Sequence, residues 1–107
     1  MTPEGRVKKL VSTYLNDLDR NGIPVYYSMF VPVGYGKRNS LDFTVCIAGH
    51  FVAIETKEPG NWLTPLQRQT ARGMYYAGAK VFIISGPDGL AALKRWVDRH
   101  AYRLFAR

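Results

Sequence analysis

Cysteine is nearly absent from this sequence of 107 residues, and so are long apolar segments. The single cysteine, Cys46, excludes a disulfide within the chain and a zinc site built on several cysteines, and it suits a reducing compartment. No apolar run approaches the ~20 residues of a membrane-spanning helix, and the first residues lack the apolar segment of a signal peptide. We therefore expect a cytoplasmic location, with Cys46 packed rather than nucleophilic.

Acidic residues are also few: eight Asp and Glu stand against fifteen Lys and Arg, and the formal net charge is +7. Such a charge favours a polyanionic partner, with nucleic acid as the first candidate and anionic lipid as the second. Hydrophobic residues make up 47% of the chain, which excludes intrinsic disorder. The length allows one domain, residues 1–107, and not two ordinary ones.

The first half of the chain predicts one helix and three strands. Apolar residues recur at steps of three and four from Pro3 to Asp19, which is typical of an amphipathic helix. Runs that favour strands follow at 25–31, 41–47 and 51–57. The last two runs are separated by Ala48-Gly49-His50, which predicts a hairpin with a three-residue turn.

The second half predicts two helices around a further strand. Thr64 and Gln67 form a capping box before a helix that runs to about Ala77. The apolar run at 80–85 indicates a strand buried on both faces, and a last helix begins near Pro87. The order αβββαβα predicts an α/β fold in which helices flank a mixed sheet.

Charged residues on the predicted hairpin indicate a catalytic metal site. Glu55 and Lys57 are two apart on a strand, so their side chains share one face, and the hairpin can bring Asp42 beside Glu55. Two carboxylates this close repel each other unless a cation lies between them, and oxygen ligands of this kind suit Mg²⁺. The ion would acidify a water, which Lys57 could position or deprotonate. Glu4, on the inward stripe of the first helix, is placed to approach the sheet.

Each of these residues also has an ordinary structural interpretation. Asp42, Glu55 and Lys57 could form a surface salt bridge on an exposed sheet face. Gln67 is explained by the capping box without any substrate. Glu4 could be a first-turn acid that interacts favourably with the helix dipole.

The pattern Glu4, Asp42, Glu55-Thr56-Lys57 and Leu63-Thr64-Pro65-Leu66-Gln67 resembles the PD-(D/E)XK nuclease superfamily. Within it, the chain is similar to the virus-type replication-repair nuclease (VRR-NUC) domain in its short, stand-alone phage form. The resemblance covers nearly the whole chain and implies a restriction-endonuclease-like αβββαβ core. One departure is visible, because Leu41 stands where the superfamily pattern has proline.

The resemblance also implies roles for single residues. Asp42 and Glu55 would ligate Mg²⁺ or Mn²⁺ with help from the Thr56 backbone carbonyl. Lys57 would be the catalytic lysine. The first helix would add Glu4, acting directly or through water, and the second helix would add Gln67.

We therefore expect a metal-dependent DNA endonuclease, and likeness to the stand-alone phage members implies branched DNA, such as a four-way junction, as its substrate. Symmetric nicking of two strands needs two sites, so we expect a homodimer, with an apolar stripe on the last helix as its interface. Four basic residues are our candidate DNA contacts: Lys37, Arg38, Arg68 and Arg72.

Two other functions stay open at this point. The first is a non-catalytic nucleic-acid-binding module that keeps the fold and the basic surface. The second is a nuclease that acts on linear or single-stranded DNA. Cleavage of junction, duplex and single-stranded substrates with and without metal distinguishes all three.

Overall fold

The computed structural model describes residues 1–31 and 39–102. Its first element, α1 (Pro3–Arg20), is the amphipathic helix that the sequence predicts. Thr2 caps the helix, because its hydroxyl oxygen accepts a hydrogen bond of 3.0 Å from the Gly5 N–H. The apolar stripe is buried as expected except at Leu10, which stays 45% exposed.

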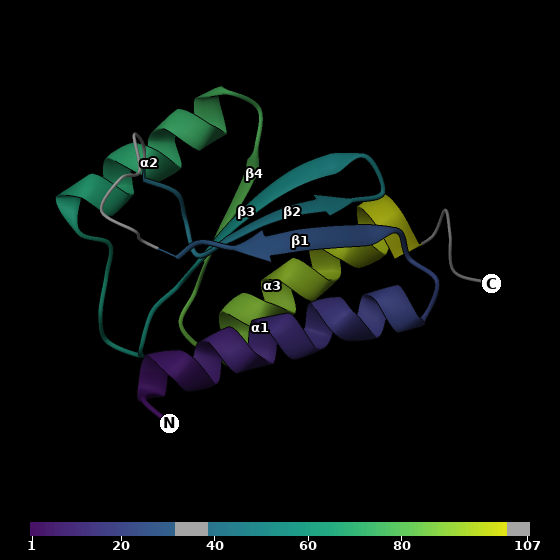
Figure 1. The fold of residues 1–107 in the computed structure, drawn as a ribbon, viewed down its shortest axis with the longest axis horizontal. Helices are drawn as coiled ribbons and strands as arrows, with labels where there is room; N and C mark the ends of the chain where they lie inside the picture. Colours follow the sequence, from purple (N-terminus) through teal and green to yellow (C-terminus); the bar gives the residue numbers. More distant parts are fainter. Residues whose placement is uncertain (32–38, 103–107) are drawn as a thin grey trace.

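Four strands form one mixed sheet, in the order β1-β2-β3-β4 (Figure 1). The first two pairs, β1 with β2 and β2 with β3, are antiparallel, and β3 with β4 is parallel. The predicted α/β architecture with a mixed sheet is thus confirmed. The strands are β1 (Val25–Met29), β2 (Phe43–Ile47), β3 (His50–Thr56) and β4 (Lys80–Ile84).

The turn between β2 and β3 is shorter than the sequence suggested. It contains two residues rather than three, since His50 already belongs to β3. Ala48 and Gly49 both have positive φ, of 48° and 88°. Positive φ at both central residues is the geometry of a type I′ turn, whose twist matches that of the strands it joins.

The helices of the second half begin where the sequence predicts, the first after its capping box and the second at Pro87. Helix α2 (Pro65–Tyr76) carries the complete capping box, and α3 (Pro87–Val97) follows β4. A short π-helical turn, η1 (Asp98–Tyr102), continues directly from α3.

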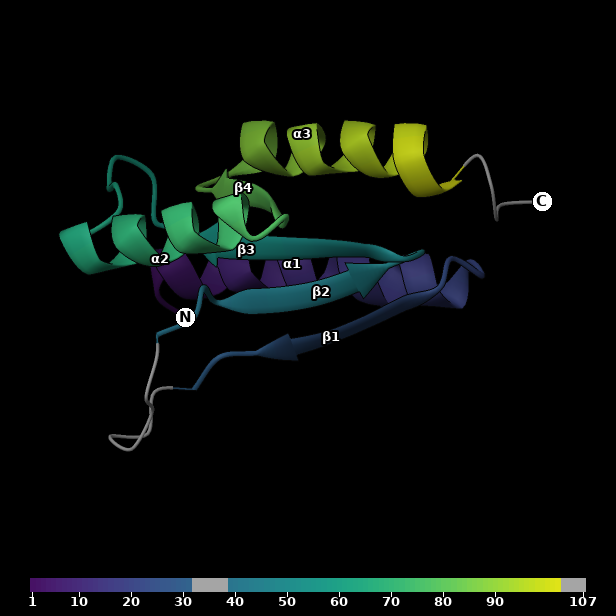
Figure 2. The same cartoon turned by 90° about the horizontal axis from the view of Figure 1, so that it is seen from above.

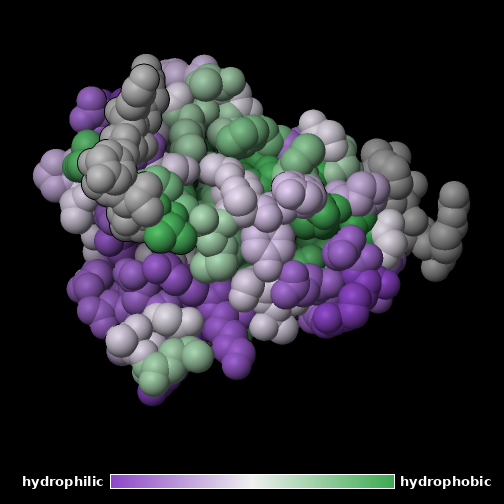
Figure 3. Space-filling model, in the orientation of Figure 1, coloured by the Kyte–Doolittle hydropathy of each residue, from purple (hydrophilic) through white to green (hydrophobic). Residues whose placement is uncertain are grey.

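The sheet separates two layers of helix. Helices α1 and α3 pack against one face, and α2 lies on the other (Figures 1 and 2). The main core lies under α1 and α3, whereas only a small cluster, Leu41, Ala53 and Ala79, lies on the α2 side. Figure 3 shows hydrophobic side chains reaching the surface across the middle of the molecule, with hydrophilic ones along the α1 side below.

Two burial predictions are wrong. β4 is an edge strand, so its run Val81–Ile83 is only half-buried and not covered on both faces. Cys46 is exposed, because it lies on the sheet face that carries α2 and α2 covers only part of that face.

The last helix does not offer the apolar stripe that we expected as a dimer interface. Leu90, Leu93 and Val97 are buried in the core of the monomer. The rest of that predicted stripe, at Leu104, lies outside the described residues. Within residues 1–31 and 39–102, no helix is long and apolar enough to cross a membrane.

Candidate active site

Two carboxylates meet where β2 and β3 run side by side. Phe43 of β2 pairs with Ile54 of β3, so Asp42, just before β2, comes opposite Glu55. The Asp42 N–H donates a hydrogen bond of 3.1 Å to Oε1 of Glu55. The hairpin therefore places the two acidic side chains together, as the alternation of the strands predicted.

The carboxylate of Asp42 is held in a fixed orientation by Thr56. Its Oδ2 atom accepts two hydrogen bonds from that residue, at 2.9 Å from the backbone N–H and at 2.6 Å from Oγ1. The side chain of Asp42 is 18% exposed and that of Thr56 is buried. Both hydrogen bonds from Thr56 are thus made to Oδ2 of Asp42, and Oδ1 accepts neither of them.

Glu55 is a nearly buried acid, with only 3% of its surface exposed. Its pKa is raised from 4.5 to about 7, first by burial and next by the nearby charge of Asp42. The hydrogen bond from the Asp42 backbone and the positive charge of Lys57 act in the opposite direction and lower this pKa, while Glu4 adds a small increase. Around Glu55, the positive charge of Lys57 therefore does not fully offset burial and the negative charges of Asp42 and Glu4.

Lys57 follows β3 directly and is 8% exposed. Its backbone N–H donates a hydrogen bond of 2.9 Å to the carbonyl oxygen of Ile84 in β4, which fixes the start of its side chain. Its ammonium lowers the pKa of Glu55, yet it forms no ion pair within 4 Å among the residues described. A nearly buried ammonium that acts on a buried carboxylate is unlike the surface salt bridge of the ordinary interpretation.

Glu4 contacts Lys8 rather than the carboxylates of the site, although its charge adds to the raised pKa of Glu55. The Nζ atom of Lys8 lies 3.6 Å from Oε2 of Glu4 and 3.8 Å from Oδ1 of Asp42. The side chain of Glu4 is 42% exposed, so it lies nearer the solvent than its helical position indicated. In the part of the chain that the structure describes, no three His, Cys, Asp or Glu side chains are close enough to hold one metal ion together.

A pocket of about 290 Å³ opens beside these carboxylates. Asp42 and Glu55 form part of its wall, and Gln67 approaches from the first turn of α2. Oε1 of Gln67 accepts a 3.0 Å hydrogen bond from the Thr64 N–H, so its amide nitrogen is the group left to face a ligand. The other lining residues are Lys8, Phe30, Asn39, Ser40, Thr64, Leu66 and Thr70.

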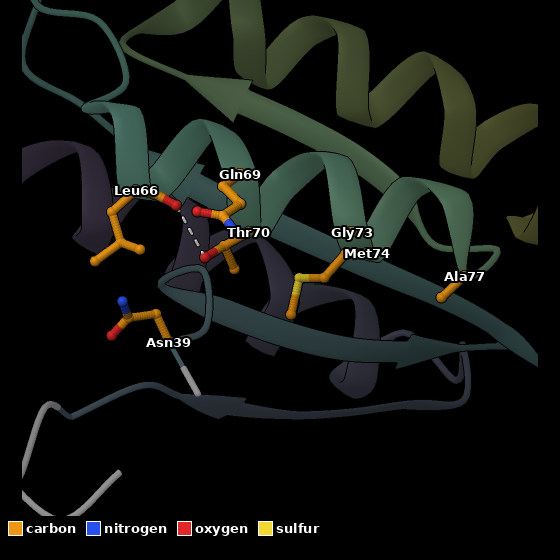
Figure 4. Close-up of a pocket in the computed structure, with 7 residues that line it drawn as sticks. All are labelled: Asn39, Leu66, Gln69, Thr70, Gly73, Met74 and Ala77. Carbon is orange, nitrogen blue, oxygen red and sulfur yellow. Dashed lines mark hydrogen bonds between the residues drawn. The ribbon is translucent and has the colours of Figure 1, made fainter. Parts of the chain in front are cut away.

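A second hollow continues from this pocket along α2 (Figure 4). Leu66, Thr70 and Asn39 border both spaces, and farther along the helix Met74 adds an apolar wall. The Thr70 hydroxyl donates to the carbonyl of Leu66 at 3.0 Å, drawn as the dashed line in Figure 4. Together the two hollows form a trough between α2 and the chain leading into β2.

Of the predicted DNA contacts, the two that the structure describes, Arg68 and Arg72, do not line the pocket. Arg68 and Arg72 are exposed on α2, and at 100° per residue they lie on the side of the helix away from both hollows. Lys37 and Arg38 lie outside the described residues.

Two site residues were missed in the sequence. Lys8 was not singled out among the basic residues, although its position four residues after Glu4 on the same helix face was the available signal. Thr56 was singled out only for its carbonyl, whereas its N–H and hydroxyl orient Asp42. No local signal gives this contact, because it depends on how the two strands are paired.

The residues present fit a hard divalent cation. Asp42 and Glu55 supply carboxylate oxygens, which are the ligands that Mg²⁺ and Mn²⁺ prefer. The raised pKa of Glu55 reflects burial and a neighbouring negative charge, and a bound cation would relieve both. With two protein carboxylates, such an ion would keep other positions for water or substrate, as is usual for Mg²⁺.

Comparison with known proteins gives one informative match. No protein-family model and no curated protein matches the chain. A solved structure described as a VRR_NUC domain superposes with a TM-score of 0.70, covering 94% of this chain and 98% of that one at 20% sequence identity. A likeness at this identity shows the fold: the chain has the restriction-endonuclease-like fold of a VRR-NUC domain, as its motifs predicted.

Proposed function

We propose that this chain, with the fold of a VRR-NUC domain, is a metal-dependent endonuclease that hydrolyses phosphodiester bonds in DNA. The observation that carries the proposal is the pairing of Asp42 with Glu55 beside the nearly buried Lys57. Glu55 and Lys57 are buried and Asp42 is mostly covered, and burying charged groups costs folding free energy, so a structural role alone does not account for them. A nuclease site accounts for all three groups.

Asp42 and Glu55 would hold Mg²⁺ or Mn²⁺, with the backbone carbonyl of Thr56 as a further ligand. When bound, such an ion acidifies a water molecule and offsets the charge that develops on the phosphoryl group. Thr56 supports this role, because its two hydrogen bonds to Oδ2 fix the Asp42 carboxylate before any ion arrives.

The remaining site residues act on the water and on the substrate. Lys57 orients the attacking water or stabilises negative charge at the phosphate. The amide nitrogen of Gln67, in the first turn of α2, donates a hydrogen bond to a substrate oxygen. Glu4 acts through Lys8 or through water, since its carboxylate does not line the pocket.

The substrate we propose is branched DNA, such as a four-way junction. The net charge of +7 favours a DNA backbone, while likeness to the stand-alone phage members of the family favours a junction over a plain duplex. Lys37, Arg38, Arg68 and Arg72 are proposed to contact phosphates outside the pocket. A homodimer would present two sites to the two strands of a junction.

The test is cleavage of a labelled four-way junction, a matched linear duplex and a single strand, each with Mg²⁺, with Mn²⁺ and with EDTA. We expect the unaltered chain to cut the junction only with metal. Asp42→Asn and Lys57→Met are expected to lose activity by about 10³-fold or more, because each removes a group that acts in the transition state.

Asp19→Asn and Lys9→Met serve as matched controls, because both residues are exposed and neither lines the pocket. Binding without cleavage under every metal would contradict the nuclease proposal and favour a non-catalytic module. Equal or faster cutting of the duplex or single strand would contradict the junction as substrate. Circular dichroism on each variant separates lost chemistry from lost folding.

A further inference from the structure

A lysine ammonium lies beside the acidic pair at the mouth of the pocket. Lys8 comes from α1, one helical turn after Glu4, and its side chain is 35% exposed. Its Nζ faces Oδ1 of Asp42, the oxygen that Thr56 does not engage. Lys8 lines the pocket together with Asp42 and Glu55, which are the proposed metal ligands.

The distances suit an electrostatic contact rather than a tight hydrogen bond. Separations of 3.6 Å and 3.8 Å to two different carboxylates exceed those of charge-assisted hydrogen bonds. The ammonium therefore shares its charge between Glu4 and Asp42 and is held firmly by neither. A group placed in this way can move away without breaking a strong bond.

Charge balance explains why an ammonium is useful here. Asp42 lies beside Glu55 and Glu4 lies farther out, and the negative charges of both raise the pKa of Glu55. Lys57 offsets part of this negative charge from the β3 side, and Lys8 offsets another part from the α1 side. A divalent ion would supply the same positive charge, so Lys8 and the ion compete for the same carboxylates.

We propose that Lys8 is the built-in counter-ion of the metal-free site: its ammonium offsets the charges of Asp42 and Glu4 until a divalent cation displaces it. This inference rests on the proposed metal-dependent function. It follows that Lys8 stabilises the metal-free protein and weakens divalent-ion binding.

The test is isothermal titration calorimetry, in which MnCl₂ is added to the purified chain. Lys8→Met keeps the length of the side chain and removes the charge. We expect this variant to bind Mn²⁺ about fivefold more tightly, the scale of one partly exposed ion pair. Its melting temperature in EDTA should fall by several degrees, and added Mn²⁺ should raise it more than it raises that of the unaltered chain.

Lys8→Arg and Lys9→Met are the controls. The first keeps the charge and should leave Mn²⁺ affinity near that of the unaltered chain. The second removes a charge from an exposed neighbour that lies outside this pocket, and it should change neither affinity nor melting temperature.

Unchanged or weaker Mn²⁺ binding by Lys8→Met, while the unaltered chain binds Mn²⁺ and Asp42→Asn does not, would overturn this inference and leave the proposed function standing. Failure of both the unaltered chain and Lys8→Met to bind Mn²⁺ would overturn the proposed metal site itself, and the counter-ion role with it. The calorimetric result thus separates the two failures without any measurement of cleavage.

Discussion

Burying the carboxylate of Glu55 costs folding free energy, which other interactions of the fold must offset. This carboxylate is almost closed off from water, and its pKa of about 7 lies well above the ordinary 4.5. Between these two pH values the folded protein keeps a proton that the unfolded chain has already lost. The folded state is therefore favoured at low pH, and this advantage is lost as the pH rises through 7.

The first prediction concerns this titration. In EDTA, the free energy of unfolding should fall as the pH rises from 5 to 7, by up to about 1.4 kcal/mol per pH unit from this group. Glu55→Gln should remove that component and be more stable than the unaltered chain at pH 8. Urea unfolding at four pH values measures it. Equal slopes for the unaltered chain and Glu55→Gln would contradict the prediction.

Glu58→Gln provides the matched control for Glu55→Gln, because it lies three residues away and is only half-buried. Its carboxylate accepts a hydrogen bond from the Asn61 side chain, which a glutamine can also accept. It should leave the pH dependence of unfolding unchanged.

Saturating Mn²⁺ should stabilise the unaltered chain more at pH 8 than at pH 5, because the ion binds the deprotonated carboxylate.

Among the elements, the β2–β3 hairpin matters most, because it joins the two carboxylate-bearing strands. Its turn places Gly49 at a φ of 88°, a region that side chains rarely adopt. A Cβ added at Gly49 would meet no atom within 4 Å. Any loss of stability from Gly49→Ala is therefore conformational and not steric.

We predict that Gly49→Ala destabilises the fold by about 1–2 kcal/mol, the cost of an L side chain at positive φ. Gly73→Ala is the opposite case, since Gly73 lies within α2 and a Cβ there also meets nothing within 4 Å. It should stabilise the fold by about 0.5–1 kcal/mol, because alanine is the better helix former. Chemical denaturation of both variants measures the difference. Equal effects in the two variants would exclude this explanation.

Sequence patterns predicted these elements well wherever the signal is local. The helix at Pro3 and the capping box at Thr64 follow from cap chemistry, which acts within one turn. The turn length was wrong, because Ala48 is not a residue type that signals positive φ. The prediction that the strand at 80–85 is buried on both faces was wrong, because an apolar run has the same sequence pattern in the centre and at the edge of a sheet.

The candidate site was predictable only as far as strand alternation reaches. Asp42 and Glu55 could be placed together, since a hairpin fixes which residues oppose each other. The hydrogen bonds of Thr56 and the ammonium of Lys8 could not, because they depend on the exact approach of separate elements. A charged residue on a helix gives the same sequence signal whether it meets solvent or a site.

On the scale of the whole molecule, α2 is less covered than the other two α-helices. None of its residues is buried, although its sequence is amphipathic. Leu66, Tyr75 and Tyr76 are 55%, 63% and 79% exposed. Since the stripe of α3 is used inside the monomer, α2 is the helix left to supply the contact of the proposed homodimer.

We predict that light scattering after gel filtration gives twice the 12.1 kDa mass of one chain. Substituting both Tyr75→Glu and Tyr76→Glu should return the mass to that of a monomer, because two buried charges oppose an apolar contact. Tyr26→Glu is the control, because Tyr26 is 82% exposed but lies in β1. A monomeric mass for the unaltered chain would refute the dimer.

The pairing of Asp42 with Glu55 is fixed far from the carboxylates themselves. The two-residue turn at Ala48 and Gly49 lies about 20 Å along the strand from Asp42 and decides which positions of the two strands face each other. A shift of this pairing by one residue would bring opposite Asp42 a neighbour of Glu55 whose side chain projects from the other side of the sheet. The hairpin tip therefore matters to the chemistry through the strand register that it sets, and only those changes at the tip that leave this register intact keep the two carboxylates together.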